Sequence, residues 1–469
     1  MGEDIAAALR QALGEGAVLD DLRTRQLHAA DALSPSRAFS VAPASWNVPL
    51  LVVMPDSTEA VARVVRLACQ YRAPVIPFGG GTGVMGAAVP CAGSIVVDLK
   101  RLNRVRAVSR EDGTALVEAG AILKDLDAAL QGHGLMLGHD PWSLPIATVG
   151  GAISTNGVGY RAARYGSMGA QVLGLEVVLP TGDVVVTSAA PKAASGPNLN
   201  GLFIGAEGTL GIITAATLRV FRAPEERRFA TVAFATFEDG FRAVAELSAL
   251  GMRPAILDLT EERRAPRAAP GVLLYLAFEG YREEVEAQEK RSLRLCREFA
   301  GQELGPQQTE AHWRERHLSG ERYQQQVLPL LPEERWARGS DRRQAWDYLH
   351  VALPVSRVLK FRQQAAAIAK EAGATVQEYS VWTAPELFSL LMTGAAVEGP
   401  GDSGAFAHAV DAILRLAQDL GGSMEYCHGV GLKLAHLVER EWGSGLDVVR
   451  RLKRVLDPYG IMNPGKLGL

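Results

Sequence analysis

The sequence has few cysteines, no long apolar run and no large excess of charge of either sign. Its four cysteines (Cys69, Cys91, Cys296 and Cys427) are scattered and form no C-x-x-C pair, which argues against a disulfide framework. No apolar segment approaches the roughly 18 residues that a membrane-spanning helix requires. The net charge is −3, so nothing attracts the whole molecule to nucleic acid or to an anionic membrane.

The N-terminal residues carry acidic side chains where a secretory signal would be basic. We therefore expect a cytoplasmic protein. The 469 residues are 48% hydrophobic and 22% charged, a composition that excludes a wholly disordered chain. The length corresponds to roughly two or three domains.

Glycine is abundant, with 49 residues in the chain and many of them in runs between residues 79 and 211. In this half, short segments rich in Val, Ile and Leu alternate with the glycine clusters and are expected to be strands. They lie at 50–55, 74–78, 94–99, 115–120, 173–180 and 211–220. A helix is expected after Asp56, with Glu59 in its cap, and another at 121–131, where Gly132 and Gly134 suit a left-handed C-cap.

From about 225 to 415 the glycine runs stop and charged residues become more frequent. We expect strands at 230–237, 255–260, 271–278, 347–353 and 375–382. Helices are expected at 239–251, 281–300, 356–372 and 405–420, and a polar, arginine-rich connection at 302–345. Long helices beside few strands favour an α+β domain with a largely antiparallel sheet.

The segment VIPFGGGTGVMG (75–86) contains a formal G-x-G-x-x-G pattern at Gly81, Gly83 and Gly86. In a nicotinamide-binding fold this pattern must open a helix, because the diphosphate lies on the helix N-terminus. Here residues 87–93 lead directly into the next strand, so that interpretation fails. Glycines still let successive backbone N–H groups converge on an anion such as a diphosphate. A tight connection between two strands is the alternative.

Two further segments, 137–166 and 203–214, repeat this composition of small residues, glycine pairs and scattered Ser, Thr and Asn. Each offers backbone donors and short hydroxyls along a polar ligand. Together with the loop at 75–86, these make three glycine-rich segments that could line one ligand, and they indicate a ligand larger than a phosphate.

In this order, the segments resemble those of the flavoenzyme superfamily of vanillyl-alcohol oxidase and p-cresol methylhydroxylase (PCMH) type, over residues 20 to 469. PFGGGTG resembles the diphosphate loop of the family, TVGGAISTNGVG its flavin segment, GAEGTLGIIT its signature strand and DPYGIMNPGK its C-terminal closure. The resemblance implies an α+β protein. A two-subdomain PCMH-type FAD-binding domain would span 1–224 (core 47–222), a cap 225–420, and a segment returning to the FAD domain 421–469.

The resemblance also implies which residues hold the FAD. They are Pro77, Phe78, Gly79, Gly80, Gly81, Thr82, Gly83, Ser143, Thr148, Gly150, Gly151, Ser154, Thr155, Asn156, Gly157, Tyr165, Gly166, Glu207, Gly208, Gly211, Ile212, Ile213 and Asn463. Some families attach FAD through a histidine of the first loop, which is absent here, so we expect non-covalent FAD. Glu207 is expected to be buried in a structural or cofactor role, because a lone buried acid must find partners.

Two branches of the superfamily compete. The VGG…N…G…YG segment and VLGLEVVLPTGDVV resemble the D-lactate, glycolate and related 2-hydroxy-acid dehydrogenases. GHDPWSLPIATVGG, SGPNLNGLFIGAEGTLG and HWRERH resemble alkylglycerone-phosphate synthase, which uses FAD to exchange an acyl for an alkyl chain on dihydroxyacetone phosphate. We favour oxidation of a small 2-hydroxy acid with hydride transfer to flavin N5, and keep the synthase as the alternative.

Oxidation of a 2-hydroxy acid needs a base for the hydroxyl proton and a cation for the carboxylate. His428 in CHGVG is the expected base, since an imidazole has an ordinary pKa near 6.5. Arg316 is the expected carboxylate fork, and Arg343 is a weaker candidate. The synthase branch employs a cap tyrosine as acid/base, for which Tyr379 is the nearest residue.

We expect no metal, because the nine histidines form no ligand spacing. In addition, Cys427 stands where the metal-dependent branch carries a glutamate. The expected partners are a small-molecule substrate and a separate electron acceptor, for which an iron–sulfur or other redox protein stays open, as does a homodimer. We expect no nucleic acid and no transmembrane segment.

Overall fold

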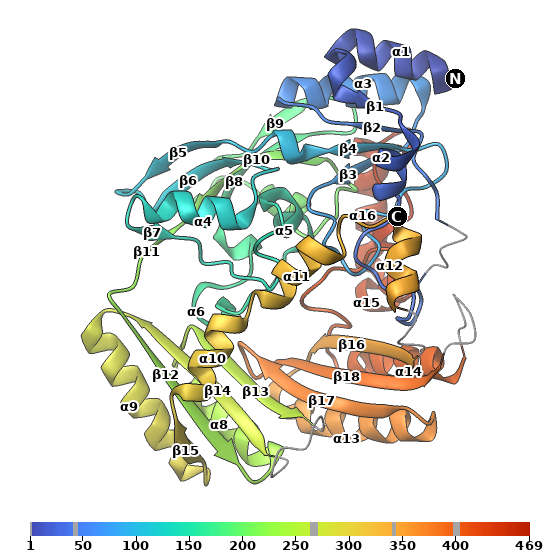
Figure 1. Cartoon of the computed structure of the whole chain (residues 1–469). Helices are drawn as coiled ribbons and strands as arrows, with labels where there is room; N and C mark the ends of the chain where they lie inside the picture. Colours follow the sequence, from blue (N-terminus) through green and yellow to red (C-terminus); the bar gives the residue numbers. More distant parts are fainter. Residues whose placement is uncertain (1, 41–45, 263–270, 340–343, 397–403) are drawn as a thin grey trace.

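The computed structural model describes residues 2–40, 46–262, 271–339, 344–396 and 404–469. Within these residues the chain forms three larger sheets (Figure 1). The first sheet has the order β1-β2-β4-β3, and β2 and β3 both run parallel to β4. Its strands and helices are β1 (Val18–Leu19), β2 (Leu51–Val53), β3 (Val75–Phe78), β4 (Ile95–Asp98), α1 (Gly2–Leu13), α2 (Leu22–Leu27) and α3 (Thr58–Tyr71).

The connection from β3 to β4 is a loop without a helix over residues 79–94, all of which are described. The prediction that the G-x-G-x-x-G pattern does not open a Rossmann helix is therefore confirmed. The end of the chain comes back to the same sheet, where Met462 forms a parallel bridge with Val75 of β3.

The second sheet is antiparallel, with the order β5-β6-β10-β8-β9. Its strands are β5 (Val105–Ser109), β6 (Thr114–Glu118), β8 (Val172–Val178), β9 (Val184–Val186) and β10 (Ile212–Arg219). The helices of this region are α4 (Leu123–Gln131), α5 (Val149–Thr155), α6 (Ala162–Tyr165) and α7 (Asn200–Phe203), and a small ladder joins β7 (Leu135–Met136) to β11 (Phe221–Arg222).

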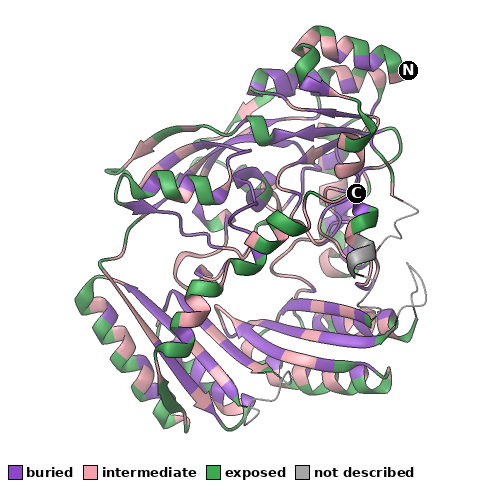
Figure 2. Ribbon diagram, in the orientation of Figure 1, coloured by how far each residue is buried: buried purple, intermediate pink, exposed green. Residues whose placement is uncertain are grey.

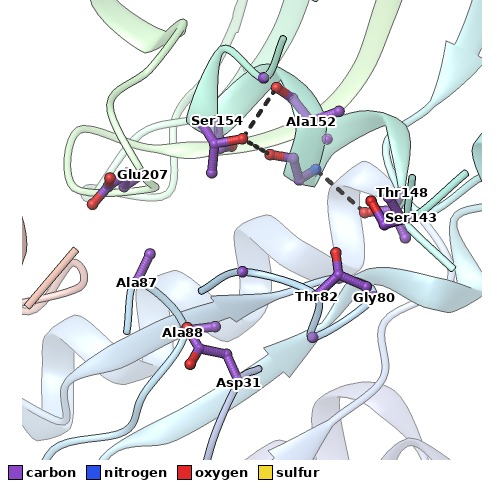
Figure 3. Close-up of a pocket in the computed structure, with 18 of the residues that line it drawn as sticks. Asp31, Gly80, Thr82, Ala87, Ala88, Ser143, Thr148, Ala152, Ser154 and Glu207 are labelled. Atoms are coloured by element: carbon purple, nitrogen blue, oxygen red, sulfur yellow. Dashed lines mark hydrogen bonds between the residues drawn. The ribbon is translucent and has the colours of Figure 1, made fainter. Parts of the chain in front are cut away.

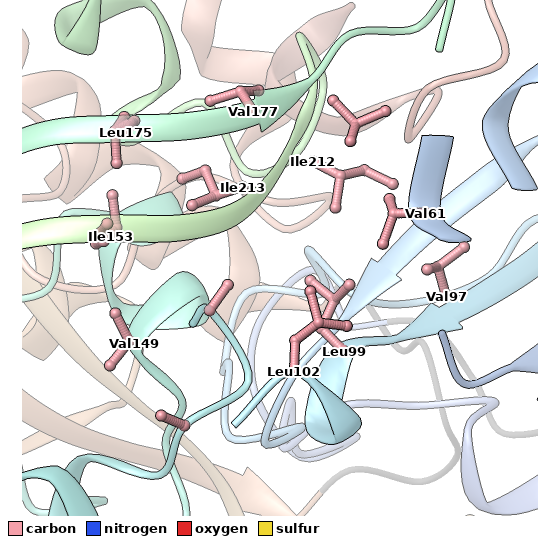
Figure 4. Close-up of a cluster of buried hydrophobic side chains, with 14 of the residues drawn as sticks. Val61, Val97, Leu99, Leu102, Val149, Ile153, Leu175, Val177, Ile212 and Ile213 are labelled. Atoms are coloured by element: carbon pink, nitrogen blue, oxygen red, sulfur yellow. The ribbon is translucent and has the colours of Figure 1, made fainter. Parts of the chain in front are cut away.

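Side chains from the first and second sheets share one hydrophobic core (Figure 4). Val61 of α3, Val97 of β4 and Val177 of β8 are all fully buried in it. Because β-branched side chains pack well on a pleated surface, the Val/Ile-rich segments of the sequence became the strands that meet here. The two sheets are therefore held as one body around the glycine-rich loops.

The third sheet has seven strands in the order β15-β12-β14-β13-β17-β18-β16, and all its ladders are antiparallel. The α+β fold is confirmed. The strands are β12 (Glu226–Phe234), β13 (Ile256–Glu262), β14 (Val272–Gly280), β15 (Gln302–Gly305), β16 (Gln344–Ala352), β17 (Thr375–Trp382) and β18 (Leu387–Ala396). The helices α8 (Phe237–Ala249), α9 (Arg282–Glu298), α13 (Val355–Glu371) and α14 (Ala405–Asp419) accompany it, and their outward faces are exposed (Figure 2).

The segment expected as an irregular polar connection, 302–345, is instead mostly regular. It contains β15 and the helices α10 (Gln307–Glu315), α11 (Leu318–Gln326) and α12 (Pro332–Gly339). Figure 1 shows α10 in front of the third sheet and α11 running from there toward α5. Their helical period is weak in the sequence because α10 buries only Thr309 and α11 only Gly320.

Other expectations differ in detail. The strand β18 was missed, and Ser57 rather than Asp56 caps α3, since its hydroxyl accepts from the Ala60 N–H at 3.3 Å. Gly132 has an ordinary right-handed conformation, and the left-handed residue after α4 is Gly134.

The C-terminal elements are α15 (Val438–Trp442) and α16 (Ser444–Leu456). None of the helices in the described ranges is long and apolar enough to span a bilayer. The domain boundaries themselves stay predictions.

Candidate active site

The three glycine-rich segments line one cavity, which encloses about 1220 Å³ of empty space including its open mouth. Figure 3 shows Ser154 and Ala152 on one wall and Thr82, Ala88 and Asp31 on the opposite one. All the predicted FAD-binding residues line this cavity except Asn156, Tyr165, Gly166 and Asn463.

The glycines of the first loop are needed because two walls meet there without room for side chains. A Cβ on Gly79 would lie 2.3 Å from Thr148 Oγ1, and one on Gly80 would lie 2.3 Å from the carbonyl oxygen of Ile146. Gly81 has φ +64°, a conformation that only glycine adopts without strain. The cavity wall is therefore bare main chain, which suits a ligand that backbone N–H groups can bind closely.

The other four predicted residues do not line the cavity, and their contacts are mostly with the structure around it. Asn156 accepts from the Gly169 N–H at 2.9 Å, and Tyr165 packs against Phe221 with ring centroids 4.5 Å apart. Gly166 has φ +77° beside Tyr165. Asn463 donates to the carbonyl oxygens of Ala87 and Glu207, at 3.0 and 2.6 Å, and so ties the C-terminal segment to two loops of the cavity.

Glu207 joins the cavity to the loop that carries His428. Its Oε1 accepts from the N–H groups of Val430 at 2.5 Å and Gly431 at 3.0 Å, and its Oε2 accepts from Gly431 at 2.8 Å. Burial raises the pKa of Glu207 to about 7, although these N–H groups favour the carboxylate. Glu207 thus has partners, as a buried acid requires, and those partners are the two residues that follow His428-Gly429.

His428 lines the cavity beside Cys427. Burial and the nearby positive charges of Arg37 and Lys433 lower the pKa of His428 to about 3, which corrects the expectation of a value near 6.5. The imidazole is neutral over the ordinary pH range and its Nδ1 has no hydrogen-bond partner among the described residues. A neutral ring can accept a proton, and a negatively charged ligand would raise its pKa by offsetting the two cations.

Buried charges lie behind His428. Asp347 pairs with Arg37 at 2.7 Å and with Lys433 at 2.9 Å. Arg37, Asp347 and Lys433 form a cluster of buried charged residues with Glu425. The Glu425 Oε1 accepts from the N–H groups of Cys427 at 2.7 Å and His428 at 2.9 Å. Burial raises the pKa of Glu425 to about 7, so its negative charge is incomplete near neutrality. The cluster therefore presents a positive field to His428.

One face of the third sheet supplies polar side chains next to His428. The His350 ring lies 4.7 Å from the His428 ring, and His350 Nδ1 is 2.7 Å from Ser389 Oγ. Tyr348, two residues before His350 on β16, hydrogen-bonds the Glu378 carboxylate and lies 3.3 Å from Ser380 Oγ. Because side chains alternate along a strand, these residues of β16, β17 and β18 all belong to the same face.

Tyr379 lies on the other face of that sheet. It is 7% exposed within the hydrophobic core, with Phe388 at 6.1 Å between ring centroids and Arg362 over its ring at 4.6 Å. The structure does not bring Tyr379 to the cavity, and this corrects the expectation that it acts as an acid/base. Its neighbour Glu378 points to the polar face instead.

Arg316 is not among the residues that line the cavity, and part of its guanidinium is already bound. Its Nε donates to Asp140 at 2.8 Å and its Nη1 to the Trp313 carbonyl at 2.5 Å. Asp140 also contacts Arg161 at 3.3 Å and His317 at 2.7 Å. The hydrogen bond from His317 and the charges of Arg161 and Arg316 outweigh burial and lower the pKa of Asp140 well below the ordinary value. Asp140 directly follows His139, which lines the cavity. Arg343 lies outside the described residues.

The structure also adds cavity residues that the motifs did not identify, namely His139, Asp31 and Trp142. His139 is 2% exposed, and its Nδ1 has no hydrogen-bond partner among the described residues. His139 lies inside a segment already recognised as glycine-rich, which was the available signal. Over the described residues, no group of three or more His, Cys, Asp or Glu side chains could hold a metal ion.

Comparisons with known proteins show the family of this chain. Residues 223–467 match the family model described as FAD linked oxidases, C-terminal domain, and residues 49–188 match the FAD binding domain. The chain belongs to the FAD-linked oxidase family. It is an FAD-dependent oxidoreductase, and the prediction of FAD as cofactor is confirmed.

Three relatives cover most of the chain. The glycolate oxidase subunit GlcD of Bacillus subtilis is 27% identical over 92% of this chain and 91% of its own length. The mitochondrial D-lactate dehydrogenase [cytochrome] of Arabidopsis thaliana is 30% identical over 90% of this chain and 74% of its own length. The alkyldihydroxyacetonephosphate synthase of Trypanosoma brucei brucei is 27% identical over 89% and 73%.

Solved structures with the same fold include an alkyldihydroxyacetonephosphate synthase and p-cresol methylhydroxylase. The first has a TM-score of 0.78 and 21% identity, covering 98% of this chain and 85% of its own. The second has a TM-score of 0.75 and 19% identity, covering 100% and 96%. At these identities the likeness concerns the fold alone, and it confirms the PCMH-type architecture.

The cavity fits FAD on its own chemistry. The first loop offers a cradle that any Cβ would fill, and the buried Asp31 and His139 each leave a polar atom without a partner in the described chain. The glycine loops would hold the diphosphate. Non-covalent attachment of FAD stays a prediction.

Proposed function

We propose that this protein oxidises a small 2-hydroxy acid to the 2-oxo acid, with His428 as the base that takes the hydroxyl proton. FAD, when bound, supplies the hydride acceptor. The observation that carries the proposal is the neutral, cavity-lining imidazole of His428 in front of the cations Arg37 and Lys433. An anionic substrate beside these cations would raise the pKa of His428 and so improve it as a base.

For the substrate carboxylate we propose Arg316, which does not itself line the cavity but is bound to Asp140, the residue between the cavity-lining His139 and Pro141. Its bond to Asp140 fixes the guanidinium, and Trp313 supports it with the ring centroid 3.9 Å away. A fixed guanidinium loses less conformational entropy when it binds a carboxylate. The relatives named for glycolate and D-lactate support a substrate of this class.

The test is anaerobic mixing of the yellow protein with D-lactate or glycolate. Hydride transfer should bleach the flavin absorbance within one turnover, because no acceptor is present to reoxidise it. A flavin that stays oxidised with every small 2-hydroxy acid tried would overturn the proposal.

The alternative is an alkyl-transferring synthase, which a relative and a second cavity favour. This cavity, of about 620 Å³, borders the first at Asp31 and includes Leu33, Trp46, Tyr323 and Val327, a lining with room for a hydrocarbon chain. Conversion of acyl-dihydroxyacetone phosphate and a fatty alcohol to the alkyl product, without net flavin reduction, would support this alternative.

That an iron–sulfur or other redox protein accepts the electrons, and that the protein is a homodimer, also stay proposals. Co-purification of a redox protein and the solution mass would test them.

A further inference from the structure

Asp31 lies on the wall of the FAD cavity, in the segment between α2 and β2, and none of the cofactor motifs includes it. It is 4% exposed and lines the cavity. Figure 3 shows its carboxyl group on the wall opposite Ser154 and Ala152.

The two carboxyl oxygens of Asp31 have different surroundings. Oδ1 accepts a hydrogen bond from the Leu33 N–H at 3.0 Å. Oδ2 has no hydrogen-bond partner among the described residues. It lies against the glycine loop, since a Cβ on Gly83 would come within 3.4 Å of it. The Ala32 N–H donates to the Gly83 carbonyl at 2.8 Å and holds the two segments together.

Among the described residues, no cation neutralises this carboxyl by direct contact. Burial raises the pKa of Asp31 to about 6, although the N–H groups of Leu33, Ala88 and Gly86 and the more distant charge of Lys466 act to lower it. The Lys466 ammonium is bound to the Val89 carbonyl at 2.7 Å. The other charged or titratable groups that face Asp31 are Glu207 and Tyr323. A buried carboxylate oxygen without a partner is costly, so a donor from outside the chain would stabilise it.

FAD carries such donors next to the group that the glycine loop suits. A carboxylate repels the diphosphate, but it accepts strongly from hydroxyl groups, and FAD has ribityl hydroxyls on one side of its diphosphate and ribose hydroxyls on the other. We propose that Asp31 Oδ2 accepts a hydrogen bond from one of these hydroxyls and so selects the position of the cofactor in the cavity. Asp31 is then a cofactor-binding residue, whatever the substrate.

The test replaces Asp31 by asparagine in the full chain. Asp31→Asn keeps an oxygen for the Leu33 N–H and puts an N–H donor where Oδ2 was. The Kd of FAD, measured by quenching of its fluorescence on titration with apoprotein, should rise roughly 10- to 100-fold, the range for losing one hydrogen bond to a charged group. The melting temperature of the apoprotein should stay equal or rise, because a buried carboxyl is removed.

The pH dependence gives a second measurement. The wild-type Kd should fall from pH 5 to pH 7, because the ionised form of Asp31 is the better acceptor, and Asp31→Asn should lose this dependence. Asp56→Asn, at an exposed carboxyl of the same half, is the control with an unchanged Kd. If the asparagine variant does not fold, Asp31→Ser keeps a local acceptor but is too short to reach Gly83, and it should weaken FAD binding in the same way.

Two results would overturn the proposal. The first is a Kd within about twofold of wild type in either folded variant. The second is an apoprotein melting temperature that falls by several degrees while FAD binding is unchanged, since Asp31 would then only organise residues 83–88 or serve the second cavity.

Discussion

The FAD-binding half and the third sheet present two different kinds of surface to the site. On the FAD side the cavity is lined by main chain and small residues, and positions such as Gly79 and Gly80 leave no space for a Cβ. On the sheet side, large polar side chains lie next to His428, among them His350 and its neighbour Tyr348. In the function that we propose, cofactor binding depends on side chains that are missing, whereas substrate chemistry depends on which side chains are present.

The largest effect is expected where the two surfaces meet, at His428. His428→Ala should slow flavin reduction by about 10²- to 10⁴-fold, the usual contribution of a general base, while FAD stays bound because the glycine cradle is unchanged. Stopped-flow absorbance under anaerobic conditions, with D-lactate or glycolate, measures the rate. A variant that is reduced as fast as wild type would remove His428 as the base.

The next effect concerns the backbone-built surface. Gly81→Val should raise the Kd of FAD by roughly 10- to 100-fold, because φ is +64° and the new Cβ would lie 2.9 Å from the Phe78 ring. Gly93→Val is the matched control. Gly93 lies in the same loop with φ +72° but has nothing within 4 Å of its Cβ position. The contrast fails if both variants purify with full flavin, or if both lose it equally.

A smaller effect is expected at Glu207, which connects the cavity to the His428 loop. Glu207→Gln should slow flavin reduction about tenfold, because a hydrogen bond to a charged group is replaced by a weaker one. Since the pKa of Glu207 is raised from 4.5 to about 7 in the folded protein, wild type should lose stability as pH rises through this interval. Melting curves from pH 5 to 8 should show a shallower decline for the variant. A decline as steep as that of wild type would contradict the assignment.

The smallest effect distinguishes the two faces of one sheet. Tyr379→Phe should change the flavin reduction rate less than twofold, since Tyr379 lies in the hydrophobic core. Tyr348→Phe should change it more, because this hydroxyl bonds Glu378 on the face next to His350. Equal rates in the two variants, measured in the same stopped-flow assay, would show that the polar face does not take part in the reaction.

Most of the residues predicted to bind FAD line the cavity, and they could be named from the sequence because the glycines that pack against Ile146 and Thr148 form a recognisable local pattern. His428 could be named from its motif, but its lowered pKa could not, because Arg37 and Lys433 come from distant parts of the chain. Tyr379 was misassigned because its strand carries polar residues on one face and Tyr379 on the other.

By itself, the sequence determined the three glycine-rich walls and the absence of a Rossmann helix after the first of them, because these follow from local backbone conformation and the lack of side chains. The class of cofactor followed from the resemblance of these segments to a known flavoenzyme superfamily. Only the tertiary structure decided that Glu207 holds the His428 loop, that Asp140 binds Arg316 and that Asp31 borders the cavity. Each of these contacts joins residues far apart in the chain, and the packing of the sheets, not any local pattern, brings them within hydrogen-bond distance or onto one wall.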